Sequence, residues 1–137
     1  MKLNPYLNFN GQCAAAFKFY EQCLGGTNLM MMTHGASPMA AQTPPEWHDK
    51  IMHAQLTVGQ TVLMGSDAPP EYFVPPQGFS VSLSVDSAAE AEHLFSALAQ
   101  DGKITMPLQQ TFWAARFGMC VDGFGIPWII NGETTAG

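Results

Sequence analysis

The sequence has little charge, and very few of its charged residues are basic. Charged residues make up 12% of the 137, and only five are Lys or Arg, which leaves a net charge of −6. Phosphate recognition needs clustered basic side chains, so this composition excludes nucleic acid as a partner and argues against an anionic membrane surface. A lightly charged surface is typical of a chain partly covered by a partner, and we expect a homodimer.

Cysteine is scarce, and long apolar runs are missing. The three cysteines, Cys13, Cys23 and Cys120, are odd in number and have no CxxC spacing. This pattern argues against a disulfide framework or a zinc knuckle and predicts buried free thiols. No apolar run reaches the ~18 residues of a membrane span, and no signal-peptide pattern opens the chain. The sequence therefore predicts a soluble, cytoplasmic protein without a membrane partner.

What the sequence does contain is a strand and a helix in close succession. Apolar and polar residues alternate over Leu3–Phe9, which predicts a strand with one buried face. Over Gln12–Leu24, Cys13, Phe17, Tyr20 and Leu24 recur at helical spacing. Gly25-Gly26 is then expected to end that helix.

A similar strand and helix follow later in the chain. Serines alternate with apolar residues over Phe79–Val85, and Ser87 with Glu90 forms a capping box before a second helical stripe that Gly102 ends. Several matching pairs differ by 76 in residue number: Leu7 and Leu83, Phe9 and Val85, Phe19 and Phe95, Gly26 and Gly102. The chain therefore repeats one structural unit.

Three strand-like runs follow each helix. In the first half they cover about Thr27–His34, Ile51–Val58 and Thr61–Ser66, and in the second about Lys103–Thr111, Arg116–Asp122 and Pro127–Asn131. The pattern predicts an α+β fold in which two tandem β-α-β-β-β units form a curved mixed sheet around a central cavity. We expect a single domain over residues 1–137, with a first unit at about 1–67, a linker loop at about 68–77 and a second unit at about 78–133.

Two proline-rich loops interrupt this pattern. They cover Gly35–Trp47 and Asp67–Gln77, and the second also links the two halves. Stiff loops of this kind often border a binding site.

The face of each sheet that its helix leaves uncovered, here called the open face, is expected to line the cavity. Alternation places Tyr6, His53 and Gln55 on the open face in the first half. In the second half it places Ser82 there, and Arg116 too, if Phe117, Met119 and Val121 pack on the helix. Such a surface could bind a small polar or anionic ligand.

Some of these residues have alternative explanations. His53 is the best catalytic candidate, as an acid or base, but no nucleophile stands beside it in the sequence, and a structural role remains open. Trp113 could stack on a ligand or simply pack, and Arg116 could clamp an anion or form an internal ion pair.

Two further groups could suggest a metal. His34, His48 and His53, with Asp49, lack the spacing of a metal site. Met30-Met31-Met32 is more typical of core or interface filling, since neighbouring residues of a strand point to opposite faces.

Several short motifs together resemble a known family. They are Asn4-Pro5-Tyr6-Leu7, Phe19-Tyr20 before Leu24-Gly25-Gly26, Met64-Gly65-Ser66-Asp67-Ala68-Pro69-Pro70, Thr111-Phe112-Trp113, Arg116-Phe117-Gly118 and Gly125-Ile126-Pro127-Trp128. The set, which spans nearly the whole chain, is similar to the PhnB-like branch of the vicinal oxygen chelate superfamily, also called glyoxalase/bleomycin resistance/dioxygenase. This resemblance implies paired units, a cavity between them and commonly a homodimer.

The resemblance also implies where a metal would bind. Enzymes of the superfamily hold a divalent ion with side chains from the first and last strands of each unit, usually His and Glu. The corresponding positions here are Asn4, Ser80, about Met64 and about Ile129. These residues are poor ligands for a hard cation, so we expect no family metal site and no cofactor.

The sequence favours two functions and leaves open a third, in which the chain is a structural dimer without a ligand. The first is a binding protein that holds a small molecule without metal, like the bleomycin-resistance members. The second is an enzyme of the lyase, isomerase or dioxygenase type that acts on a small polar substrate. Proteins of this branch also carry a description as quinone methyltransferases, but no glycine-rich loop joins a strand to a helix here to hold a nucleotide cofactor. The ligand-binding candidates are Tyr6, His53, Gln55, Ser82, Trp113 and Arg116.

Overall fold

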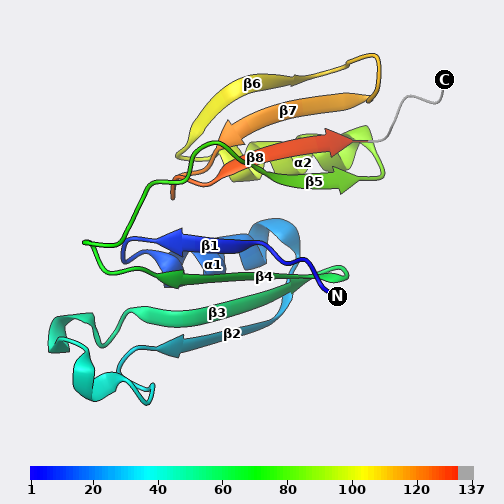
Figure 1. The fold of residues 1–137 in the computed structure, drawn as a ribbon. Coiled ribbons are helices and arrows are strands. Elements are labelled where there is room, and N and C mark those ends of the chain that lie inside the picture. The colour runs from blue at the N-terminus through cyan, green and yellow to red at the C-terminus, as the bar shows by residue number, and fades with distance from the viewer. Residues whose placement is uncertain (133–137) are drawn as a thin grey trace. The chain divides into compact units, whose positions relative to one another are not determined.

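The computed structural model describes residues 1–132 and has the predicted α+β architecture. The chain divides into two compact units, Met1–Pro75 and Pro76–Gly137. Each unit contains one helix and one four-stranded mixed sheet in the order β-α-β-β-β (Figure 1). The duplicated unit is therefore confirmed. The linker at about 68–77 and the division as one domain stay predictions, and the expected end of the second unit at residue 133 lies outside the described residues.

The first unit has a parallel pair at one edge and antiparallel pairs elsewhere. Its sheet order is β1-β4-β3-β2, and only the β1–β4 pair is parallel. The elements are β1 (Tyr6–Phe9), α1 (Cys13–Leu24), β2 (Thr27–Thr33), β3 (Ile51–Val58) and β4 (Thr61–Asp67), with short 3₁₀ turns η1 (Ala40–Gln42) and η2 (Pro45–Trp47) between β2 and β3.

The second unit repeats this topology. Its sheet order is β5-β8-β7-β6, and again only the first pair is parallel. The elements are β5 (Val81–Val85), α2 (Ala88–Ala99), β6 (Lys103–Gln109), β7 (Arg116–Val121) and β8 (Pro127–Gly132). The predicted strands match these within two residues at each end, apart from β1, which starts at Tyr6 and not at Leu3.

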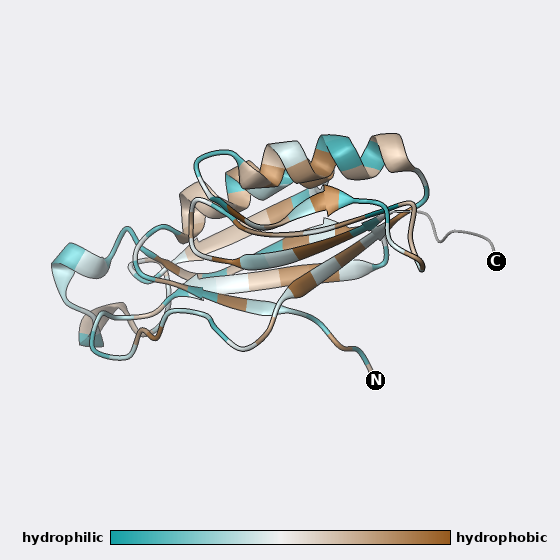
Figure 2. Cartoon of the chain, turned by 90° about the horizontal axis from the view of Figure 1, so that it is seen from above, coloured by the Kyte–Doolittle hydropathy of each residue, from teal (hydrophilic) through white to brown (hydrophobic). Residues whose placement is uncertain are grey.

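Apolar side chains fill the space between each helix and its sheet. In the first unit Phe17 and Tyr20 of α1 are fully buried, as are Ala54 and Leu56 of β3. Figure 2 shows the matching alternation of hydrophobic and hydrophilic residues along the strands. The neighbours of Ala54 and Leu56 in β3 are only partly buried, which confirms that His53 and Gln55 lie on the open face.

The helix ends follow the predicted chemistry. The Ser87 hydroxyl accepts a hydrogen bond from the Glu90 backbone N–H at 3.1 Å, which confirms an N-terminal cap on α2. Gly25 follows α1 with a φ of 67°, the left-handed conformation that glycine adopts without a steric penalty.

The repeat is less regular than a single step of 76. The edge strands β2 and β6 start at Thr27 and Lys103, 76 residues apart. The buried helical residues Cys13, Phe17 and Tyr20, however, match Ala91, Phe95 and Leu98, which differ from them by 78. The predicted match of Phe19 with Phe95 is therefore wrong, because the residues of α2 that face the sheet come two positions later than a step of 76 would give, and Phe95 takes the place of Phe17.

Two buried carboxylates fix the loops of the two units. Asp67, 3% exposed, accepts backbone N–H groups of Gly11, Cys13 and Ile51, each at 2.9 Å. It thus ties the start of α1 to the start of β3. Neither this role nor the next one was predicted.

Asp122 holds the β7–β8 turn in the same way. It accepts the backbone N–H groups of Phe124 and Ile126 and, at 2.8 Å, the indole N–H of Trp128. The indole group is itself deep in the core, since Trp128 is 1% exposed.

Two of the three thiols are buried beside these carboxylates. Cys13 is fully buried and Cys120 is 1% exposed, as predicted, whereas Cys23 is partly exposed. Burial, and secondarily the Asp67 carboxylate, raises the pKa of Cys13 far above its usual range. Burial, with Asp122 as the second cause, raises the pKa of Cys120 to about 11.

This environment predicts selective thiol chemistry. Because the thiolate is the nucleophile, Cys13 and Cys120 should not react with Ellman's reagent at pH 8 until the protein unfolds, while Cys23 reacts first. Stopped-flow absorbance with and without urea checks this. The Cys23→Ser protein should lose the fast phase alone, and equal rates for all three thiols in the folded protein would contradict the expected burial.

No helix among the described residues is long and apolar enough to cross a membrane.

Candidate functional site

Three of the predicted ligand-binding residues meet on the open face of the first sheet. The Tyr6 hydroxyl lies 3.4 Å from Nδ1 of His53, and the Gln55 amide nitrogen lies 3.0 Å from Nε2 of the same ring. The Tyr6 and His53 rings are 5.9 Å apart and tilted by 35°. Tyr6 is 45% exposed, so the group is open to solvent at the phenol.

The sheet order brings these residues together. His53 and Gln55 are two apart on β3, so they share a face. Tyr6 stands on β1, and β4 lies between the two strands. Tyr6 and Gln55 are both paired with Met64, so they occupy one row across the sheet, and the phenol reaches over β4 to the imidazole.

These contacts allow one consistent pattern of hydrogen bonds through the three side chains. An amide nitrogen can only donate, so the Gln55 side chain as oriented donates to Nε2 of His53. The ring proton then sits on Nδ1 and is donated to the Tyr6 oxygen. The Tyr6 O–H remains available as a donor. The group can therefore present a directed hydrogen-bond donor, backed by an imidazole, to a ligand above the sheet.

Ser82 occupies the equivalent position in the second unit. It lies on β5 opposite Ile129 of β8, as Tyr6 lies opposite Met64, and it is exposed. Asn131, also on β8, has a buried Oδ1 without a hydrogen-bond partner in the described part of the chain. The second open face therefore has polar groups, but none like the Tyr6–His53–Gln55 group.

Trp113 belongs to an aromatic cluster at the end of β7. Its ring packs edge-on against Phe112 at 4.7 Å and against Phe117 at 5.2 Å, and 42% of the residue is exposed. Both earlier explanations, packing and stacking on a ligand, stay compatible with this position.

The predicted face of Arg116 is wrong. Its Nε donates to Glu92 of α2 at 3.1 Å. Gly132, its partner on β8, faces α2, because a Cβ on Gly132 would meet Ala91 of that helix. The Cβ of Arg116 lies on the same side, 3.6 Å from where that Cβ would be. Arg116 is therefore on the helix-covered face, and the ion pair is the alternative that the structure contains. Gly118 and Cys120 are buried on the same face. Because both residues are small, α2 can approach this face closely, and a Cβ on Gly118 would lie 2.9 Å from Phe95.

At two of the positions where the resemblance would place metal ligands, the residues present are poor donors. Met64 supplies a thioether and Ile129 supplies no donor at all, where carboxylates would be needed for a hard divalent ion. Within residues 1–132, no three His, Cys, Asp or Glu side chains gather as a metal cluster. His48 instead bonds the carbonyl oxygens of Ala40 and Thr43 and holds its own loop together.

The two proline-rich loops border a cavity within the first unit. Its volume is about 670 Å³, and its walls include Pro44 and Trp47 from one loop, Pro69 and Tyr72 from the other, and His34 at the end of β2. Both loops therefore border a cavity, and whether it is a binding site stays a prediction. The cavity is separate from the Tyr6–His53–Gln55 group, whose members do not line it.

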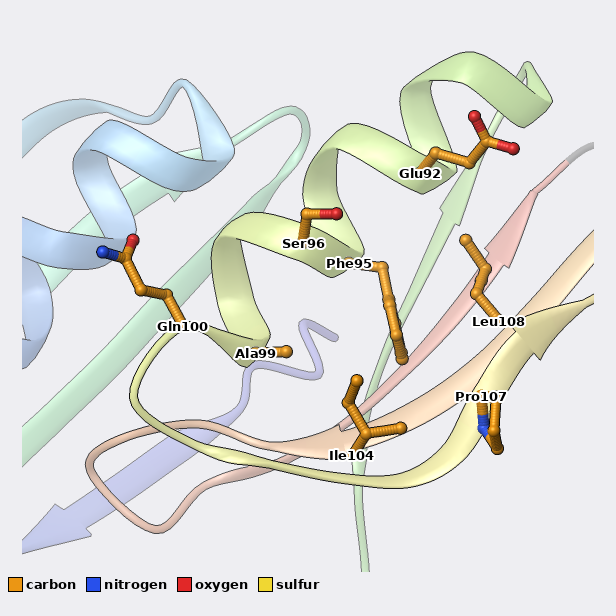
Figure 3. Close-up of a pocket in the computed structure, with 8 residues that line it drawn as sticks. All are labelled: Glu92, Phe95, Ser96, Ala99, Gln100, Ile104, Pro107 and Leu108. Atoms are coloured by element: carbon orange, nitrogen blue, oxygen red, sulfur yellow. The ribbon is translucent and has the colours of Figure 1, made fainter.

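A second cavity lies between α2 and the edge strand β6. It measures about 610 Å³, and Figure 3 shows Phe95 from the helix and Ile104 and Leu108 from the strand around its apolar floor. It is on the helix side of the second sheet.

Comparisons with known proteins agree with the observed fold. Residues 1–131 match the family described as 3-demethylubiquinone-9 3-methyltransferase. Protein YjdN of Escherichia coli is 37% identical over 139 residues, 96% of this chain and 95% of that protein. The crystal structure of PA1353 from Pseudomonas aeruginosa is 52% identical with a TM-score of 0.89, over 97% of this chain and 98% of the other.

More distant structures share the fold. The PhnB protein from Bacillus cereus is 23% identical with a TM-score of 0.76, over 97% of this chain and all of the other. A glyoxalase/bleomycin resistance/dioxygenase family enzyme from Burkholderia phytofirmans is 15% identical with a TM-score of 0.62, over 93% and 95%.

Proposed function

The chain belongs to the family described as 3-demethylubiquinone-9 3-methyltransferase, a PhnB-like family of the glyoxalase/bleomycin resistance superfamily, and from this premise we propose that it binds a small polar molecule on the open face of its first sheet. The observation that carries the proposal is the Tyr6–His53–Gln55 group. Its phenol is exposed, and the two ring nitrogens of His53 lie within hydrogen-bond distance of the Tyr6 hydroxyl and the Gln55 amide nitrogen.

The chemistry of this group favours a ligand with a hydrogen-bond acceptor. A carbonyl, carboxylate or similar oxygen can accept from the Tyr6 hydroxyl, while the half-buried His53 and Gln55 fix the phenol in position. Ser82 and Trp113 stay predictions for the second unit, whereas Arg116 is left out because Glu92 already pairs with it.

The methyl transfer named in the family description is not included. A nucleotide-type methyl donor needs backbone N–H groups from a glycine-rich strand-to-helix loop or an equivalent cradle. The two strand-to-helix junctions here are Asn10-Gly11-Gln12 and Asp86-Ser87. The first contains a single glycine and the second contains none.

A melting-shift screen tests the proposal. Small metabolites that carry carboxylate or carbonyl groups are added to the protein in chelator-treated buffer, and a hit is followed by titration calorimetry. Tyr6→Phe should weaken binding about fivefold, since one hydrogen bond contributes roughly 1 kcal/mol. Tyr72→Phe, an exposed tyrosine in the loop cavity, is the matched control and should bind normally. Weaker binding in Tyr72→Phe alone would place the ligand in the loop cavity and refute the proposed site.

An enzyme is the second candidate, because the contact between Tyr6 and His53 could move a proton. His53→Gln separates the two functions on any hit. A binding protein should keep its affinity within a few-fold, as glutamine can still hydrogen-bond, whereas an enzyme should lose turnover while it still binds. Product formation by mass spectrometry gives the readout.

A further inference from the structure

The methionine run of β2 is exposed beside this group. Met30, Met31 and Met32 are 63%, 37% and 44% exposed, although thioether side chains are usually buried. The sequence favoured core or interface filling because neighbouring residues alternate between faces. The pairing of β2 with β3 shows which of the three methionines lie on the same face as His53.

The strand register places two of the three methionines next to His53. Met32 is paired directly with His53, and Met30 is paired with Gln55. Met31 is paired with Ala54, whose side chain is fully buried under α1. Met30 and Met32 therefore project from the open face, and Met31 projects from the other face.

This arrangement brings soft donors within reach of one point. Directly opposite side chains on neighbouring strands have Cβ atoms about 5 Å apart, and diagonal pairs about 7 Å. Methionine has three rotatable bonds, so both thioether sulfurs can swing toward the imidazole. The donor set is two neutral thioethers and one imidazole nitrogen.

The orientation of His53 suits a metal ligand. The lone pair on Nε2 is the one that now accepts from Gln55, at 3.0 Å, and a metal ion would take it in place of that amide. Nδ1 lies 3.4 Å from the Tyr6 hydroxyl, so this nitrogen has a hydrogen-bond partner of its own. A ligating histidine typically has such a partner on its other nitrogen, which fixes the ring.

From this geometry we propose that Met30, Met32 and His53 bind a soft monovalent metal ion, Cu(I) or Ag(I). Thioether ligands select soft ions such as Cu(I), imidazole is also a copper ligand, and the set contains no carboxylate that would hold a hard divalent ion. The inference goes beyond the proposed function, although it shares His53 and Tyr6 with it.

Anaerobic titration of Cu(I) against a chromophoric chelator tests the site, with Ag(I) followed by NMR of methionine-methyl-labelled protein. The Cys23→Ser background is used because a partly exposed thiol would compete for the ion. One equivalent should bind, and the Met30 and Met32 methyl signals should shift while Met31 and Met39 stay in place. Met39 is 55% exposed and lies outside the sheet.

Three variants separate the proposed site from general methionine affinity. The double change Met30→Leu/Met32→Leu should weaken Cu(I) binding by at least about 100-fold, since even the loss of an outer partner costs 10–100-fold. His53→Gln should weaken it similarly. Met31→Leu, the matched control on the opposite face, should change it less than about threefold, because it removes no proposed ligand. Circular dichroism verifies that each variant is folded.

Two results would overturn the inference: equal shifts of all exposed methionine methyls, or unchanged Cu(I) affinity in the double variant. Either would leave the run as a surface for packing. The small-molecule screen is run with chelator present, so its failure counts against the proposed function only, and failure of the metal titration counts against this inference only.

Discussion

Replacement of Asp67 by alanine is expected to lower the free energy of unfolding by about 3–5 kcal/mol. Its carboxylate accepts the backbone N–H groups of Gly11, Cys13 and Ile51, and it is 3% exposed. Alanine would leave two buried donors and the partly buried Gly11 N–H without an acceptor, and each buried one costs roughly 1–3 kcal/mol if no water enters. Urea unfolding gives the measurement, as a lower midpoint with an unchanged slope.

Two further variants make this test specific. Asp67→Asn keeps one acceptor oxygen but places an amide N–H opposite a backbone N–H donor. It should therefore lower the free energy of unfolding, but by less than the alanine change does. Asp86→Ala removes an exposed carboxylate before α2 and should change stability by less than about 0.5 kcal/mol. If Asp67→Ala and Asp86→Ala had the same free energy of unfolding, the hydrogen bonds of Asp67 would not contribute measurably to stability.

The second large effect is expected at Gly102. A Cβ on this glycine would collide with the backbone carbonyl oxygen of Val121 and come within 2.9 Å of two backbone atoms of Asp122. Because backbone cannot rotate aside as a side chain can, the turn between α2 and β6 must move away from the end of β7. Gly102→Ala should therefore cost at least about 3 kcal/mol, the upper range of overpacking.

Gly25→Ala is the control for this second effect. Gly25 has a φ of 67° and no atom within 4 Å of a new Cβ, so alanine there meets only the backbone penalty of about 1–2 kcal/mol. Thermal unfolding of both variants gives the comparison. If Gly25→Ala were the more damaging change, close packing at Gly102 would not limit stability.

The strands of the first unit were predictable because their two faces differ in polarity. Leu7 and Phe9 are 2% exposed while Tyr6 is 45% exposed, and a period of two encodes that difference directly. The same rule placed His53 and Gln55 on one face. For these residues the sequence pattern was sufficient, since neighbours in a strand alternate whatever the strand pairs with.

The face of Arg116 was not predictable in this way. In β7 apolar residues occupy both faces, with Phe117 and Met119 on one and Cys120 on the other, so alternation gives no direction. We expected the larger side chains, Phe117 and Met119, to pack on the helix. In the structure α2 packs on Gly118 and Cys120. Small residues allow close approach of α2, and only the packed structure reveals that the helix comes this near.

By itself the sequence determined the order of the elements, the duplication of the β-α-β-β-β unit and the polar character of the first open face. The tertiary structure decided which side chains meet: Tyr6 with His53 across β4, Met32 beside His53, and Asp67 with three distant backbone groups. The physical reason is that local periodicity specifies a residue's face, while its partners depend on strand order and register. Those are set by packing over the whole unit.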